Sequence, residues 1–324
     1  MHFYINLNTD PAFNLALEQT LCEGLDDFFM LWQNDNAVII GRNQITAAEL
    51  NADFIKEHHI KVVRRMTGGG AVYHDMGNIN YTIGTTQRLL RPDAFQIHAE
   101  PILQALRELG VPAEFSGRND LIADGKKFSG AARSVLKHNT LFHGTLLFDT
   151  NLSVLSQALC PDPDKIHAKG IKSTQSRVVN LKSYLPHYTT AQFIDKFSAI
   201  IQPYFKSTQI DKIPQEAIQK AELLAEKQYR TWNWNYGTQI SYEYSKKKRF
   251  AGGSIRVQYS VKKNQISKIK FSGDFFGEKP IVELTEKFIG SAPNPEELSK
   301  NIAAINIKDY LHNITKEEMI SLFQ

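Results

Sequence analysis

Cysteine is scarce in this chain: Cys22 and Cys160 are the two that occur among 324 residues, and they form no CxxC pair. The spacing therefore indicates neither a disulfide framework nor a cysteine-based zinc site, and we expect a reducing, cytoplasmic compartment. Long apolar runs are scarce too, because no stretch reaches the roughly 18 uninterrupted apolar residues of a membrane helix. The N-terminus lacks a basic segment followed by an apolar one. We predict neither secretion nor membrane insertion.

A strong excess of charge of one sign is absent as well. Lys and Arg total 38 and Asp and Glu total 34, so the net charge of +4 gives no general argument for nucleic-acid binding. The excess is concentrated between residues 246 and 270, where nine residues are basic and none is acidic. This basic strip is compatible with a solvated sheet face and with a surface that steers an acidic partner. Its members are Lys246, Lys247, Lys248, Arg249, Arg256, Lys262, Lys263, Lys268 and Lys270.

The composition is that of a globular protein, with 42% hydrophobic and 22% charged residues, and 324 residues leave room for two domains. Asp10-Pro11 predicts the start of an amphipathic helix, and the runs 28–32 and 37–40 predict a hairpin. We predict one helix over 47–58 and another over 95–109, which Pro101 kinks or restarts. Most predicted strands are joined by links of hairpin length, whereas a parallel sheet needs long crossovers. The pattern therefore favours an α+β fold with mostly antiparallel strands. A change to strand-like alternation predicts domains 1–245 and 246–324.

The most informative segment reads Arg64-Arg65-Met66-Thr67-Gly68-Gly69-Gly70-Ala71-Val72-Tyr73-His74-Asp75-Met76-Gly77-Asn78. Three consecutive glycines let backbone N–H groups approach a ligand closely and form a nest for phosphate oxygens, and the arginines add charge. The segment matches neither GxGxxG nor the P-loop, since strand-like residues follow the glycines. A glycine-rich hairpin turn with solvated arginines is the alternative interpretation.

Two further segments carry polar residues whose interpretation is open when each is taken singly. Asn119-Asp120 could contact Mg²⁺ or form a turn, and Lys126-Lys127 before Phe-Ser-Gly could reach a phosphate or be a solvated loop tip. The stretch 169–181, Lys-Gly-Ile-Lys-Ser-Thr-Gln-Ser-Arg-Val-Val-Asn-Leu, is typical of a basic lid.

Taken together and in order, these motifs resemble the lipoate–protein ligases. The resemblance rests on Arg-Arg-x-Thr-Gly-Gly-Gly-Ala-Val-Tyr-His-Asp-x-Gly-Asn, Asn-Asp-Leu, Lys-Phe-Ser-Gly-x-Ala, His-Gly-Thr-Leu-Leu and Lys-Gly-Ile-x-Ser-x-x-Ser-Arg-Val-x-Asn-Leu, and it covers essentially the whole chain. It implies the α+β fold of biotin and lipoate ligases, with flanking helices, and a small α+β C-terminal domain. Biotin protein ligases share that fold but carry a different Arg/Gly loop.

The resemblance also implies roles for individual residues. Lys127 is the expected catalytic residue, bridging the acyl carbonyl and the α-phosphate, and Asp120 the expected metal ligand. ATP and the adenylate are expected at Gly68, Gly69, Gly70, Ala71, Val72, Tyr73, His74, Asp75, Asn78, Asn119 and Lys127. Lipoate is expected at Trp32, Gly41, Arg42, Arg65, Gly69, Lys127, His143 and Gly144. Closure over the adenylate is expected from Lys169, Gly170, Ser173, Ser176 and Arg177.

The implied reaction needs ATP, Mg²⁺ and lipoate, forms a lipoyl-adenylate, and modifies a lysine of acceptor lipoyl domains, those of 2-oxoacid dehydrogenase E2 subunits or the glycine-cleavage H protein. Such acceptors tend to be acidic. We expect a monomer without nucleic-acid or membrane partners. Two alternatives remain: an octanoyl- or lipoyl-transferase that uses Cys22 or Cys160 as a thioester, and a lipoyl-adenylate sensor without catalysis.

Overall fold

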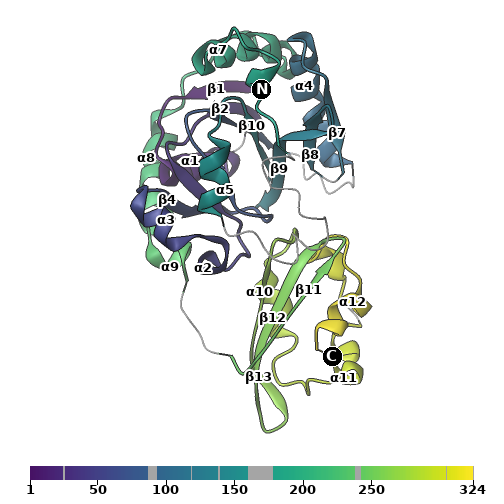
Figure 1. Ribbon diagram of the computed structural model, residues 1–324. Helices are drawn as coiled ribbons and strands as arrows, with labels where there is room; N and C mark the ends of the chain where they lie inside the picture. Colours follow the sequence, from purple (N-terminus) through teal and green to yellow (C-terminus); the bar gives the residue numbers. More distant parts are fainter. Residues whose placement is uncertain are drawn as a thin grey trace. The chain divides into compact units, whose positions relative to one another are not determined.

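The computed structural model describes residues 1–24, 26–86, 93–117, 119–137, 139–159, 178–237, 242–303 and 305–323 (Figure 1). The chain forms two compact units. The first contains Met1–Ile39, Leu50–Arg64 and Val72–Asn235, and the second contains Ile40–Glu49, Arg65–Ala71 and Tyr236–Gln324. Two short internal segments, one with the three glycines, therefore belong with the C-terminal part of the chain. The domain boundary near residue 245 stays a prediction.

The first unit is built on a seven-stranded sheet in the order β1-β2-β6-β10-β9-β8-β7. β1 and β2 pair in parallel and are joined by helix α1, whereas the other pairs of this sheet are antiparallel. The predicted α+β class with mostly antiparallel strands is confirmed. The bounds are β1 His2–Asn6, α1 Pro11–Cys22, β2 Phe28–Trp32, β6 Asn78–Thr85, β7 Ala113–Ser116, β8 Asp120–Ala123, β9 Lys126–Leu136 and β10 Asn139–Leu147.

The two faces of this sheet differ in chemistry. Along β6, Ile79, Tyr81 and Ile83 enter a core that also contains residues of α4 (Ala94–Glu108) and α7 (Thr190–Ile201). Because side chains alternate along a strand, the buried Asn78, Asn80 and Thr82 lie on the opposite face. Helix α4 continues through Pro101 and does not restart there. The other helices of this unit are α3 Ala52–Glu57, α5 Leu152–Ala158, η2 Leu181–Ser183, η3 Gln202–Phe205, α8 Gln215–Leu224, the π-helix η4 Ala225–Tyr229 and α9 Trp232–Asn235.

The predicted hairpin of residues 28–40 is wrong. β2 is flanked by β1 and β6, so both of its edges are occupied. β3 (Ala37–Ile40) instead lies in a separate sheet between β4 (Lys61–Arg64) and β5 (Val72–His74). The helix predicted over 47–58 is two short ones, α2 (Thr46–Glu49) and α3, since the Asn51 side chain caps α3 by accepting from the Phe54 N–H.

The second unit contains the antiparallel strands β11 (Tyr244–Phe250), β12 (Gly253–Lys262) and β13 (Gln265–Gly273), drawn in green in Figure 1. Ile255, Val257 and Phe271 face a core shared with its helices. The opposite face carries Lys247, Arg256 and Lys270 of the basic strip, because Lys247 pairs with Arg256 and Lys270 with Gln258. The helices are α10 Ile281–Glu286, α11 Pro295–Ile302, η5 Ile307–Asp309, α12 Lys316–Ile320 and η6 Ser321–Phe323. No helix in the described ranges is long and apolar enough to cross a bilayer.

Candidate functional site

The predicted site residues divide between the two units. Gly41, Arg42, Arg65 and residues 68–71 belong to the second unit, and the other described ones belong to the first. Lys169, Gly170, Ser173, Ser176, Arg177 and Cys160 lie outside the described residues.

Arg65 organises the glycine segment of the second unit. Its backbone N–H donates to the Ile40 carbonyl at 2.9 Å. Its guanidinium donates from Nε to Thr67 Oγ1 at 2.9 Å, and from Nη2 to the carbonyl oxygens of Gly68 at 2.7 Å and Gly70 at 2.8 Å. The arginine is 6% exposed. It therefore shapes the loop itself, by turning two of its carbonyls toward a buried charge.

Packing explains why glycine is required in and beside this loop. A Cβ at Gly41 would lie 2.0 Å from the carbonyl oxygen of Gly69, and a Cβ at Gly68 would lie 2.6 Å from that of Phe275. Gly69 also has φ +92°, a conformation that side chains disfavour. The glycines are therefore needed for close backbone approach, while their predicted contact with phosphate stays a prediction.

Asp75 in the first unit builds the turn between β5 and β6. Its Oδ1 accepts from the N–H groups of Gly77 at 2.9 Å and Asn78 at 3.1 Å, and its Oδ2 accepts from the Asn151 N–H at 2.8 Å. This is an Asx-type turn in which one carboxylate accepts from three backbone donors. Its predicted contact with ATP remains a prediction.

A buried polar network lies between α1 and the sheet. The indole Nε1 of Trp32 donates to Thr82 Oγ1 at 2.8 Å, and that hydroxyl donates to Glu18 Oε2 at 3.0 Å. His143 Nδ1 lies 2.9 Å from Glu18 Oε1. Trp32 also meets the His74 ring edge-on, with centroids 6.5 Å apart. The fold thus brings together three predicted site residues, Trp32, His74 and His143.

The sequence pattern predicts α1 as an amphipathic helix and does not identify Glu18 as a site residue. Glu18 is 2% exposed, and Asn14, four residues earlier on the same side of the helix, is fully buried. Two polar residues at this spacing within a run of apolar ones are the signal that could have identified them. Gly144 is not part of this network: it pairs with Tyr81 and faces its hydroxyl on the opposite side of the sheet.

Lys127 and Asp120 form an ion pair on neighbouring strands of the first unit. Lys127 Nζ lies 2.7 Å from Asp120 Oδ1, and the two side chains are 41% and 39% exposed. The Asn119 amide donates to the Ala131 carbonyl, and the Ala131 N–H donates back to the Asn119 carbonyl at 2.9 Å. Asn119 thus holds β8 against β9 and fixes the strand that carries Asp120.

We expect Gly130→Ala to displace Lys127. Asp120 pairs with Gly130 across the strands, and the ammonium lies over that glycine, where an added Cβ would be 2.9 Å from Nζ. The side chain is flexible at its end, so the lysine should move away while the fold is retained. The thermal midpoint should change by less than about 3 °C, whereas any activity that depends on Lys127 should fall at least tenfold. A large loss of stability with unchanged activity would contradict this placement.

Within the described part of the chain, no group of three or more His, Cys, Asp or Glu side chains converges in a way that could hold a metal ion. The predicted metal ligand Asp120 uses one carboxylate oxygen to accept from Lys127. These residues alone do not fit a protein-built Mg²⁺ site, which needs several oxygen ligands.

Residues 10–202 match a family model described as the lipoyl protein ligase A/B catalytic domain, and residues 239–323 match the bacterial lipoate protein ligase C-terminus. The chain belongs to the lipoate–protein ligase family. It is 36% identical to lipoate-protein ligase LplJ of Bacillus subtilis, covering 98% of this chain and 97% of that one. It is also 36% identical to lipoate–protein ligase 1 of Staphylococcus aureus, covering 99% of both.

Solved structures of this family have the same fold. A bipartite lipoate protein ligase of Thermoplasma acidophilum, described with its E2 lipoyl domain, gives a TM-score of 0.66 at 26% identity and covers 75% of this chain and 98% of its own. A lipoate-protein ligase A bound with ATP gives 0.63 at 26%, covering 73% and 98%. LipL1 of P. falciparum gives 0.78 at 24% identity, covering 99% and 98%, which supports the fold alone. The predicted family and ligase class are confirmed.

Proposed function

We propose that this ligase joins free lipoate to a lysine of acceptor lipoyl domains in an ATP-dependent reaction with a lipoyl-adenylate intermediate. The observation that carries the proposal is the Lys127–Asp120 pair: a half-exposed ammonium held in place on two paired strands of a lipoate–protein ligase fold. Similarity to a ligase solved with ATP and to one described with an E2 lipoyl domain supports ATP as co-substrate and a lipoyl domain as acceptor.

The reaction has two steps. A lipoate carboxylate oxygen attacks the α-phosphorus of ATP, and pyrophosphate leaves. The lysine amine of the acceptor then attacks the acyl carbon, AMP leaves, and the amine loses a proton. Negative charge grows on phosphate oxygens in the first step and on the acyl oxygen in the second, so a positioned ammonium such as Lys127 stabilises both. Within the first unit, we propose that residues 72–78 contact the adenylate and that Trp32 and His143 bind lipoate.

Mg²⁺ supplies charge neutralisation on the triphosphate when it is bound. Since Asp120 is the single carboxylate assigned to it, most of its ligands would be phosphate oxygens and water. No step above depends on protein side chains holding the ion.

The transferase alternative needs a cysteine thiolate. Cys22 is 2% exposed, and burial raises the pKa of its thiol to about 12, so the thiol stays protonated at neutral pH. This disfavours Cys22 as a nucleophile, and the relatives named above are ligases.

Mixing the protein with ATP and lipoate tests the proposal. We expect pyrophosphate release, followed by a mass increase on an added lipoyl domain or H protein. A Cys22→Ser/Cys160→Ser variant should retain both. Loss of transfer in that variant would favour the transferase, and adenylate formation without transfer to any acceptor would favour the sensor.

The basic strip of the second unit is the surface we propose to steer an acidic acceptor. Lys247→Glu/Lys262→Glu should raise the KM for the acceptor about five- to tenfold at low salt, and less at high salt, because charge attraction at a surface is screened. Pyrophosphate release should not change. Lys287→Glu/Lys308→Glu, at two exposed positions of the same unit, the C-cap of α10 and the short helix η5, makes the same change in net charge and is the matched control. Equal effects of the two double variants on the KM for the acceptor would contradict steering by the basic strip.

A further inference from the structure

Two buried histidines of the first unit face different kinds of hydrogen-bond partner at Nδ1. His143 is 8% exposed, and its Nδ1 lies 2.9 Å from the Glu18 carboxylate. His74 is 4% exposed, and its Nδ1 lies 3.0 Å from Nδ2 of Asn34. A carboxylate accepts, whereas an amide nitrogen donates and does not accept. Nδ1 of His143 must therefore carry a proton, and Nδ1 of His74 must not.

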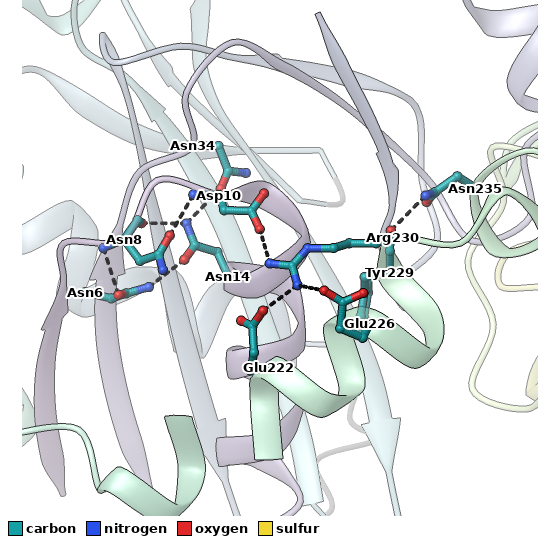
Figure 2. Close-up of polar contacts among 10 residues, drawn as sticks. All are labelled: Asn6, Asn8, Asp10, Asn14, Asn34, Glu222, Glu226, Tyr229, Arg230 and Asn235. Carbon is teal, nitrogen blue, oxygen red and sulfur yellow. Dashed lines mark hydrogen bonds and ion pairs between the residues drawn. The ribbon is translucent and has the colours of Figure 1, made fainter. Parts of the chain in front are cut away.

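The direction of the Asn34 amide follows from backbone groups that can only accept. Asn14 Nδ2 lies 2.8 Å from the carbonyl oxygens of both Asn8 and Gln33, so the nitrogen end of this amide is placed without ambiguity. The third contact of that nitrogen, at 3.0 Å, shares one of its two hydrogens, and it is to the oxygen of Asn34 because two amide nitrogens would repel each other. Asn34 consequently turns its own nitrogen toward His74. Figure 2 shows Asn14 between Asn6, Asn8 and Asn34.

Asn14 is itself held from the other side. Its Oδ1 accepts from Asn6 Nδ2 at 2.7 Å, and Asn14 and Asn34 are both fully buried. Reversing either amide would place two donors or two acceptors against each other in the protein interior, where each unsatisfied polar group costs on the order of 1–3 kcal/mol. The chain of amides is therefore fixed in one direction, from the backbone to His74.

We infer that α1, through Asn14 and Asn34, holds His74 as a neutral imidazole with its proton on Nε2, and through Glu18 holds His143 with a proton on Nδ1. Asn14 and Asn34 are positioning residues: they act through the histidine. The protonation states do not depend on the proposed function, but the identity of the ligand that meets His74 rests on it. A ligand atom that meets His74 Nε2 must accept, as an oxygen of the acyl carboxylate or of the adenylate phosphate does.

The protonation pattern can be measured without any ligand. We expect long-range ¹H–¹⁵N correlation spectra of ¹⁵N-histidine-labelled protein to show the Nε2–H pattern for His74 near neutral pH. His98 is an internal reference for the opposite pattern, because its Nδ1 donates to the Ala94 carbonyl at 2.7 Å. His74→Gln and His98→Gln assign the signals. An Nδ1–H or imidazolium pattern for His74 in the unaltered protein overturns the inference.

A single substitution changes the hydrogen-bond partner of His74 Nδ1 from a donor to an acceptor. Asn34→Asp replaces the donor by a group that accepts, so we expect a proton on Nδ1 of His74 and a fall of about 10- to 100-fold in kcat/KM for lipoate. Asn51→Asp is the control for the same chemical change, since the exposed Asn51 side chain caps α3 by accepting from the Phe54 N–H, which an aspartate does equally well. It should leave the His74 pattern and the activity unchanged.

The two proposals fail in distinguishable ways. If Asn34→Asp keeps the Nε2–H pattern, the inference is wrong even where ligation proceeds normally. If the unaltered protein forms no lipoyl product, the proposed function is wrong and the spectrum still decides the tautomer. Should Asn34→Asp not fold, the spectrum of the unaltered protein carries the decision alone.

Discussion

Lys127→Ala is expected to slow pyrophosphate release from ATP and lipoate by at least about 100-fold. The ammonium is the charge that we place at the developing negative charge of the phosphoryl step, and removal of one such preorganised donor typically costs two to three orders of magnitude in rate. The ion pair with Asp120 contributes to this preorganisation. It holds Lys127 Nζ 2.7 Å from Asp120 Oδ1 and so limits the positions that the flexible lysine side chain can sample. Single-turnover measurement of pyrophosphate separates this step from transfer to the acceptor.

Lys126→Ala is the matched control for that experiment. Lys126 is the preceding residue on the same strand and is exposed. Strand alternation directs its side chain away from the face that carries Lys127. It should change the rate less than about twofold. If both variants lose activity equally, a general effect of charge on β9 is responsible, and the assignment of Lys127 as the catalytic residue is wrong.

The sequence predicted the family, the α+β class and the strands at 28–32 and 37–40 correctly, because each depends on neighbouring residues or on ordered motifs. The pairing of β2 and β3 could not be predicted in the same way. A short polar link is typical of a hairpin, but here β1 and β6 occupy both edges of β2. β1 itself, His2–Asn6, was not predicted, since a five-residue strand with polar ends gives little periodic signal.

The side-chain contacts of the candidate site, like the strand pairing, could not be predicted from local sequence. His74 and His143 stand within the quoted motifs, whereas their partners Asn34 and Glu18 do not. Glu18 and His143 are 125 residues apart in sequence and Asn34 and His74 are 40 apart. Glu18 meets His143 because α1 packs against β6 and β10, and Asn34 meets His74 because the turn after β2 lies beside the end of β5. Such pairs become visible once strand order is known.

Arg64→Met is expected to lower the thermal midpoint by about 5–10 °C, which corresponds to about 2–4 kcal/mol in a unit of this size. Methionine keeps the apolar stem but removes the guanidinium, whose Nε donates to the Trp234 carbonyl at 2.9 Å and whose Nη2 donates to the Asn235 carbonyl at 3.0 Å. Arg64 is 8% exposed, so both carbonyls would be left without this donor in the interior. Burial lowers the pKa of Arg64 to about 10, which leaves the group charged at neutral pH.

Arg107→Met is the matched control for Arg64→Met. Arg107 also donates to a carbonyl, that of Ala113 at 2.8 Å, but its side chain is 40% exposed and its ion pair with Glu100 is at the surface. Water can replace it, so we expect a shift of less than about 3 °C. Differential scanning calorimetry of both variants decides between them, and equal shifts would contradict the argument from burial. The sequence presented Arg64 and Arg65 as one pair of ligand-binding charges. The structure separates them, since Arg64 ties β4 to α9 through Trp234 and Asn235 while Arg65 shapes the glycine loop.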